Sequence, residues 1–173
     1  MKFFISSKRK YQFDKNKYIK GHQVEKYNNF INIVMNINSI PGELILHSQK
    51  KTKDSKNKLL GINPGASYGS AKRWDPKKFA DVAIDLSSYY DIVIFGGTGE
   101  KEIASDIEKY LIEKGVTNYQ NLSDKTSITE LISQIENLDL FITGDSGPMH
   151  LAAAYKIPTV AIFGPTNDKE TSQ

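Results

Sequence analysis

Short apolar segments alternate with amphipathic segments along the chain from residue 59 onward. Each apolar segment has about five residues and is followed by glycine or polar residues, a pattern typical of a buried strand. In the amphipathic segments the apolar residues recur every three or four positions, which is typical of a helix that packs on a sheet. Strands are therefore predicted over residues 59–63, 91–95, 118–122, 139–143 and 159–163.

Capping residues mark the starts of the connecting helices. Asp75 and Pro76 are an N-cap followed by proline at the first helical position. Ser127 and Glu130 have the spacing of a capping box. The predicted helices cover residues 76–86, about 100–114, 127–137, and a short segment from about residue 148.

This order of strands and helices predicts an α/β fold, a Rossmann-like parallel sheet with helices on both faces and right-handed crossovers. Ligands of such sheets bind outside the carboxyl ends of the strands. The segments that follow the predicted strands are rich in Gly, Ser, Thr and charged residues: 63–73, 96–102, 123–126, 144–150 and 164–168.

Residues 1–58 do not continue this pattern. An amphipathic helix is predicted over residues 22–36, and its apolar side needs a surface to pack on. No helix is predicted after the fifth strand. We therefore expect a fragment of a longer protein or one half of a two-domain fold.

The charge of the chain is uneven. Residues 1–58 carry 13 Lys and Arg against 4 Asp and Glu, whereas residues 59–173 carry 10 against 16. The basic part is a set of solvated lysines or, as the alternative, a surface for anionic lipid or phosphate. No nucleic-acid-binding signature accompanies it, so no nucleic-acid partner is expected.

The amino-acid composition excludes several classes of functional site. The chain has no Cys, which excludes disulfides, thiolate metal sites and a cysteine nucleophile, and its three His are scattered. We therefore expect no metal and no other cofactor. The apolar runs are too short to cross a bilayer and no signal peptide is recognisable, so a soluble, cytoplasmic protein is expected.

The segment after the first strand has the composition of an anion-binding loop. Gly65 and Gly69 allow backbone N–H groups to approach an anion, and Lys72 and Arg73 can neutralise its charge. The segment is not a Walker P-loop, because no Gly-Lys-Ser/Thr ends it. The alternative is that Lys72 and Arg73 only decorate a surface loop.

The segment after the fourth strand runs from glycine directly into a helix. This places backbone N–H groups and the positive end of the helix toward a ligand, with His150 in the first turn. Asp145 would cap the loop or hold a sugar hydroxyl. Asp145 and His150 as a general acid–base pair, a triad that includes Ser146, and a purely structural turn are the alternatives. The triad is disfavoured because the Gly-x-Ser-x-Gly elbow is missing.

These segments together resemble glycosyltransferase family 9, the bacterial ADP-heptose:lipopolysaccharide heptosyltransferases. The order and spacing are most similar to its heptosyltransferase II members, and the dense resemblance covers residues 59–168. Its motifs are the segments 64–66 and 71–74, Phe95-Gly96-Gly97 with Glu102, 145–154, and Phe163-Gly164-Pro165-Thr166.

The resemblance implies the donor-binding half of a GT-B fold, in which two Rossmann-like domains face a cleft. By this resemblance, residues 59–173 are the C-terminal nucleotide-sugar-binding domain, and residues 1–58 are a remnant of the N-terminal acceptor domain with the interdomain segment. Within the donor-binding half, Lys72 would contact the diphosphate, Glu102 the ribose, and Thr126 would lie beside the adenine. The nucleotide-sugar site it implies comprises Ser67, Tyr68, Lys72, Glu102, Thr126, Asp145, Ser146, Gly147, Pro148 and His150.

The activity that the resemblance implies is inverting transfer of heptose from ADP-heptose to the inner core of lipopolysaccharide or lipooligosaccharide. The donor is ADP-heptose, the acceptor is a lipid-linked core oligosaccharide, and peripheral contact with the inner membrane is expected. No catalytic residue is assigned, because the family's base, an Asp near the N-terminus of the full protein, has no counterpart here. Little activity of this chain alone is expected. A GT-B-like sugar-nucleotide epimerase and a non-catalytic remnant of a split gene remain alternatives.

Overall fold

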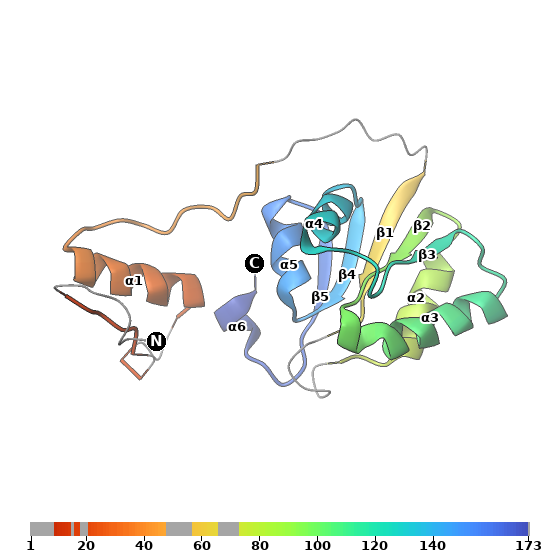
Figure 1. The fold of residues 1–173 in the computed structure, drawn as a ribbon, viewed down its shortest axis with the longest axis horizontal. Coiled ribbons are helices and arrows are strands. Elements are labelled where there is room, and N and C mark those ends of the chain that lie inside the picture. The colour runs from red at the N-terminus through yellow and green to blue at the C-terminus, as the bar shows by residue number, and fades with distance from the viewer. Residues whose placement is uncertain (1–8, 15, 18–20, 48–56, 66–72, 173) are drawn as a thin grey trace. The chain divides into compact units, whose positions relative to one another are not determined.

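The computed structural model describes residues 9–14, 16–17, 21–47, 57–65 and 73–172. The chain divides into two compact units (Figure 1). The sheet unit is Leu44–Thr166, and the helix unit combines Met1–Glu43 with Asn167–Ser172. The assignment of residues 1–58 and 59–173 to two different enzyme domains stays a prediction.

The sheet unit contains five parallel strands in the order β3-β2-β1-β4-β5. All five strands were predicted to within one residue at each end, and the parallel α/β fold is confirmed. Their bounds are β1 Lys58–Asn63, β2 Tyr90–Ile94, β3 Tyr119–Asn121, β4 Leu140–Gly144 and β5 Thr159–Ile162.

Helices cover both faces of this sheet, as predicted (Figure 1). Two helices, α2 (Pro76–Leu86) and α3 (Lys101–Glu113), pack on one face, and α3 follows a short 3-10 turn, η3 (Thr98–Glu100). The other face is covered by α4 (Ile128–Glu136) and α5 (Gly147–Ala154).

Strand periodicity divides the core into two layers. Ile92 and Ile94 point to the layer under α2 and α3, whereas Val93 and Phe95 point to the layer under α4 and α5. Gly61 lies in β1 where this second layer is tightest, and a Cβ there would overlap the side chain of Leu138. The central strand therefore requires glycine so that the aromatic side chains of the second layer can cross it.

The predicted caps form as hydrogen bonds. The Asp75 side chain accepts from the Lys77 N–H at 2.8 Å, so α2 begins where the sequence indicates. In the capping box of α4, Ser127 Oγ accepts from the Glu130 N–H, and Glu130 Oε2 accepts from the Ser127 N–H at 2.8 Å. Local sequence signals thus fix both helix starts.

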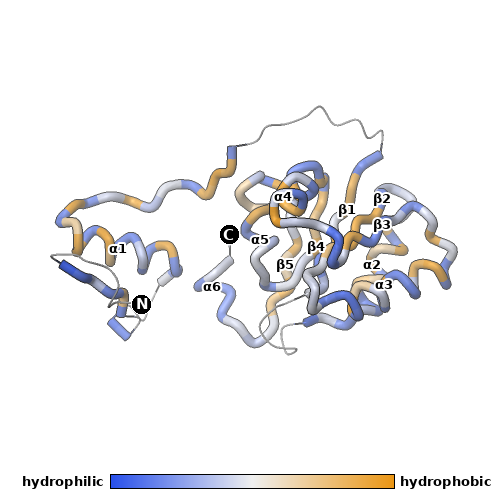
Figure 2. The backbone as a smooth tube through the Cα atoms, in the orientation of Figure 1, coloured by the Kyte–Doolittle hydropathy of each residue, from blue (hydrophilic) through white to orange (hydrophobic). Residues whose placement is uncertain are grey.

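The helix unit contains α1 (Gln23–Met35) and a one-turn helix, α6 (Asp168–Thr171). Polar contacts join them: Lys26 Nζ lies 3.1 Å from Glu170 Oε2, and the His22 ring lies 2.9 Å from the Ser172 carbonyl oxygen. Hydrophobic and hydrophilic segments alternate along α1 (Figure 2). The one turn of α6 follows β5 but belongs to the helix unit, so the expectation that the sheet domain lacks its closing helix stays a prediction.

Candidate functional site

The strand order places a topological switch point between β1 and β4. From β1 the chain adds β2 and β3 on one side, and β4 and β5 on the other. The connections therefore leave β1 and β4 in opposite directions, and a crevice opens between their carboxyl ends. The two strands end in register there, with Asn63 opposite Thr143.

A cavity of about 250 Å³, which we call the switch-point cavity, lies at this edge of the sheet. Its residues come from the end of β1, from the segments that follow β2, β3 and β4, and from the starts of two helices, so side chains distant in sequence converge on one volume. It is lined by Asn63, Gly96, Gly97, Glu100, Thr126, Ser127, Ile128, Leu131, Ser146, Gly147 and Pro148.

The N-terminus of α5 forms one wall of this cavity. Ser146 is the N-cap residue, and Gly147 and Pro148 are the first two residues of the helix. The start of a helix carries partial positive charge, because its first N–H groups have no carbonyl partner one turn earlier. In α5, Pro148 has no N–H and the Met149 N–H donates to the Ser146 carbonyl oxygen at 3.1 Å, so at this wall it is Gly147 that offers its N–H to an anion. This wall therefore suits an anion, as the sequence predicts for the segment.

Ser146 is held by the ends of both central strands. Its Oγ accepts a hydrogen bond from Asn63 Nδ2 at 3.0 Å and lies 3.3 Å from Thr143 Oγ1. Asn63 Nδ2 also donates to Thr143 Oγ1, at 3.2 Å. Sequence analysis placed Asn63 only at the end of a strand, because nothing local signals contacts to residues 80 positions away.

The side chain of Asp145 contacts Thr166, and not the hydrogen-bonded cluster of Asn63, Thr143 and Ser146. Its Oδ2 accepts a hydrogen bond from Thr166 Oγ1 at 2.8 Å, and its N–H donates to the Ile162 carbonyl oxygen at 3.2 Å. Asp145 therefore joins the segments that follow β4 and β5. Neither Asp145 nor His150, which is half-buried on α5, is among the residues that line the switch-point cavity.

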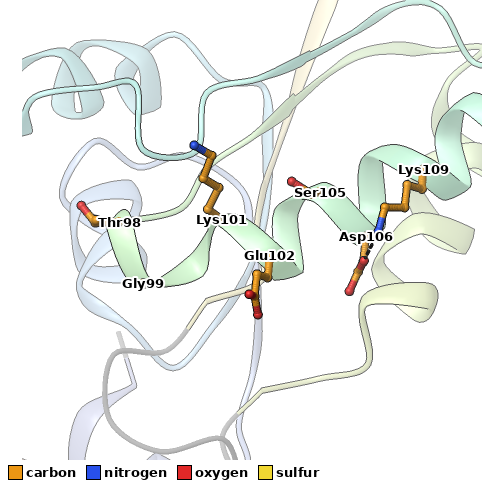
Figure 3. Close-up of a pocket in the computed structure, with 7 residues that line it drawn as sticks. All are labelled: Thr98, Gly99, Lys101, Glu102, Ser105, Asp106 and Lys109. Atoms are coloured by element: carbon orange, nitrogen blue, oxygen red, sulfur yellow. Dashed lines mark hydrogen bonds and ion pairs between the residues drawn. The ribbon is translucent and has the colours of Figure 1, made fainter.

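Glu102 lies in a second depression, which we call the α3 hollow (Figure 3). It measures about 870 Å³ and runs along η3 and one side of α3. An ion pair between Lys109 Nζ and Asp106 Oδ1, 2.9 Å apart, lies at its far end and raises the pKa of Lys109. The α3 hollow is lined by Thr98, Gly99, Lys101, Glu102, Ser105, Asp106 and Lys109.

Glu100 is a cavity residue that sequence analysis missed. Its Oε2 accepts a hydrogen bond from the Gly97 N–H at 2.8 Å, and its carboxylate lies so close to Gly65 that a Cβ there would overlap it. The available signal was the three-residue spacing from Gly97, the spacing of a cap. Glu100 and Glu102 thus face different depressions, joined by the turn that carries both.

Thr126 lines the switch-point cavity beside the capping box of α4. Hydrogen bonds from the backbone N–H and the hydroxyl of Ser127 hold the pKa of the Glu130 carboxyl below its usual value. The helix start next to Thr126 is therefore ordered by a capping box between Ser127, which lines the cavity, and Glu130, which is not among the lining residues. Ser67, Tyr68 and Lys72, the other predicted site residues, lie outside the described residues, and their roles stay predictions.

Metal and membrane features can be searched among the described residues. In that part of the chain no group of three or more His, Asp or Glu side chains is arranged to hold a metal ion. No described helix is long and apolar enough to cross a membrane. The expected independence from metal is not tested by this and stays a prediction.

Comparison with known proteins finds one family. Residues 6–173 match glycosyltransferase family 9 (heptosyltransferase). Lipooligosaccharide heptosyltransferase 2 of Campylobacter jejuni subsp. jejuni serotype O:2 is 47% identical over 97% of this chain. The match covers 54% of the length of that relative, so this chain spans about half of it.

The fold of this chain is also similar to solved structures of heptosyltransferases. The structure of Escherichia coli ADP-heptose LPS heptosyltransferase II is 33% identical, with a TM-score of 0.64, and covers 68% of this chain and 36% of that chain. E. coli heptosyltransferase WaaC, solved with ADP-2-deoxy-2-fluoro heptose, shares the fold at 18% identity, with a TM-score of 0.63 over 92% of this chain and 49% of that chain. The chain belongs to glycosyltransferase family 9, the heptosyltransferase family.

Proposed function

We propose that this chain is the donor-binding half of a heptosyltransferase, which transfers heptose from ADP-heptose to the inner core of lipopolysaccharide or lipooligosaccharide with inversion. The observation that carries the proposal is the switch-point cavity, in which the end of β1, the segments after β2, β3 and β4, and the start of α5 converge. The 47% identical relative, a lipooligosaccharide heptosyltransferase, and the 33% identical one, an ADP-heptose LPS heptosyltransferase, support this donor and acceptor.

The site serves the leaving-group side of the reaction. When the bond from the anomeric carbon to the diphosphate breaks, its electron pair stays on a phosphate oxygen, and that oxygen gains negative charge. The Gly147 N–H at the start of α5 and the Ser146 hydroxyl stabilise this charge. Lys72 joins them in this proposal, on the resemblance alone, and no metal is required.

The acceptor side belongs to the part of the relatives' length that this chain does not match. That part supplies the carboxylate base, which takes the proton of the acceptor hydroxyl as the hydroxyl oxygen bonds to the anomeric carbon. This chain alone therefore binds the donor and transfers heptose poorly or not at all. Robust transfer by the purified chain, measured with a lipid-linked core acceptor, would overturn this division of roles.

Contact with the inner membrane from the cytoplasmic side is part of the proposal. The acceptor is lipid-linked, and residues 1–58 carry a net charge of +9, which favours an anionic surface. Sedimentation with anionic vesicles, with neutral vesicles as control, tests this contact. Equal recovery with both vesicle types would remove it from the proposal.

Donor identity is tested by thermal unfolding with ADP, UDP and GDP. A nucleotide at about one hundred times its dissociation constant adds roughly 2.7 kcal/mol to the free energy of unfolding. We expect stabilisation by ADP and little by the other two. Stabilisation by UDP in place of ADP would favour a sugar-nucleotide epimerase. No shift with any nucleotide would favour a non-catalytic remnant.

A further inference from the structure

The hydrogen bonds between Asn63, Thr143 and Ser146 have a definite direction. Asn63 is 3% exposed and Thr143 is fully buried, so solvent does not compete for their polar groups. The Thr143 hydroxyl donates its one proton to the Gly144 carbonyl oxygen at 2.9 Å. It must then accept from Asn63, which turns the NH₂ group of the amide, and not its oxygen, toward both hydroxyls.

This direction leaves the Ser146 proton loosely held. Because Ser146 Oγ accepts from Asn63, the proton of the serine needs another acceptor. The two acceptors near it, the Gly144 carbonyl oxygen and Thr143 Oγ1, both lie 3.3 Å from Ser146 Oγ. Hydroxyl hydrogen bonds are usually 2.5–3.0 Å long, so about 3 Å marks the limit of a good one. The proton can therefore turn toward an anion in the cavity at small cost.

We propose that Asn63 is a positioning residue for the diphosphate of the donor. By donating to Ser146 Oγ, it keeps the proton of the serine free to point at a phosphate oxygen beside the start of α5. The inference rests on the proposed function, which places the diphosphate there. Asn63 acts through Ser146 and contributes most when the leaving oxygen gains charge.

A double-mutant cycle tests the coupling. Dissociation constants for ADP and adenosine are measured by calorimetry on the parent chain, Asn63→Ala, Ser146→Ala and the double variant. Each single variant is expected to bind ADP about tenfold more weakly, the loss of one hydrogen bond to a charged group. The double variant is expected to match Ser146→Ala within about twofold, because the two residues act as one unit. Adenosine, which lacks phosphate, is expected to bind all four alike.

Two further variants separate positioning from a structural role. Asn63→Asp keeps the size of the side chain, but its carboxylate accepts the Ser146 proton and directs it away from the ligand, so ADP affinity falls further than in Asn63→Ala. Ile142→Val is the matched control, since it removes one buried methylene group from the strand that carries Thr143 and leaves the hydrogen bonds of Asn63, Thr143 and Ser146 in place. It is expected to lower the unfolding temperature and to keep the ADP dissociation constant within about twofold.

The outcomes are distinct. The inference is overturned if both Asn63 variants bind ADP like the parent, if the losses of Asn63→Ala and Ser146→Ala add, or if Ile142→Val loses as much affinity as Asn63→Ala. Where Asn63→Ala is too unstable to purify, Asn63→Asp carries the test. A parent chain that does not bind ADP overturns the proposed function and this inference together, whereas a parent that binds ADP beside unaltered Asn63 variants overturns this inference alone.

Discussion

The switch-point cavity and the α3 hollow lie at neighbouring strand ends and are built differently. The cavity, at about 250 Å³, draws its lining from the end of β1, from the segments after three other strands and from two helix starts. The hollow, at about 870 Å³, is lined by residues 98–109, a single continuous segment. Side chains from separate elements can surround a ligand, whereas those of one helix diverge from its axis. Convergence of elements, and not volume, therefore identifies the better candidate site.

The two depressions also differ in what lies beneath them. The switch-point cavity lies at the end of β1, a strand packed in the core, where a Cβ on Gly61 would overlap Leu138 and crowd Phe141. At the α3 hollow, a Cβ on Gly99 meets no other atom within 4 Å. One depression is thus supported by the core, and the other lies on an exposed helix surface.

The largest expected effect is on the free energy of unfolding, and it follows from the tight packing around Gly61. Gly61→Ala overpacks the core and is expected to lower the free energy of unfolding by about 2 kcal/mol. Gly99→Ala, the matched change at the α3 hollow, is expected to stay within about 0.5 kcal/mol of the parent. Urea denaturation measures both. Equal effects of the two substitutions would contradict the difference in packing.

A smaller effect is expected at Glu102, which the resemblance places on the ribose. The α3 hollow begins at Thr98, directly after Gly97 of the cavity, so a nucleotide can extend from one depression to the other. Glu102→Gln is expected to weaken ADP and adenosine alike, about fivefold, since both carry the ribose. Calorimetric titration measures both ligands.

Lys109→Ala is the matched control for Glu102→Gln. Lys109 lies at the far end of the α3 hollow in an exposed ion pair with Asp106, and such pairs contribute little to stability. Its ADP affinity is expected to equal that of the parent. If Lys109→Ala weakens ADP as much as Glu102→Gln, the nucleotide occupies the hollow along α3 and the comparison fails.

The smallest expected effect is on stability and comes from the capping box at the start of α4, beside the cavity. Because the folded state lowers the pKa of Glu130, its ionised carboxyl stabilises the fold above the ordinary value of 4.5, and this contribution is lost as the pH falls through the lowered pKa. Glu130→Gln is expected to unfold slightly earlier than the parent at pH 7. The two urea midpoints should converge in acid, and a constant gap at all pH values would refute this linkage.

Most of the fold could be predicted because its signals are local. Asp75 before Pro76, and Ser127 three residues before Glu130, cap their helices through contacts within one turn. Strand bounds followed from short apolar segments that end at glycine or polar residues. The strand order needs pairing between distant segments, and the parallel arrangement was inferred from the alternation of strands and helices.

The candidate site could be predicted only in part, because its contacts are non-local. The segment that contains Ser146 was expected at a helix N-terminus and lies there. Its contact with Asn63 spans 83 positions and leaves no trace in either segment. Glu100 and Glu102 are two residues apart, and periodicity does not tell which of them faces the cavity.

The helix unit shows the same limit. The predicted apolar side of α1 is exposed at Val24, Tyr27 and Ile31, whereas Lys26 is buried beside Glu170. Periodicity predicted the helix correctly. The contacts that bury one side of α1 come from residues distant in sequence. The pattern within α1 therefore could not predict which side is buried.

The most direct test of the account is a ¹⁵N NMR titration of this chain with ADP, with adenosine as the control ligand. The account predicts that ADP shifts the amide signals of Gly96, Gly97 and Gly147 in the switch-point cavity, that adenosine leaves Gly147 unchanged, and that Lys109 responds to neither. Shifts confined to residues 101–109, or no shifts at saturating ADP, would contradict the assignment of the switch-point cavity as the donor site.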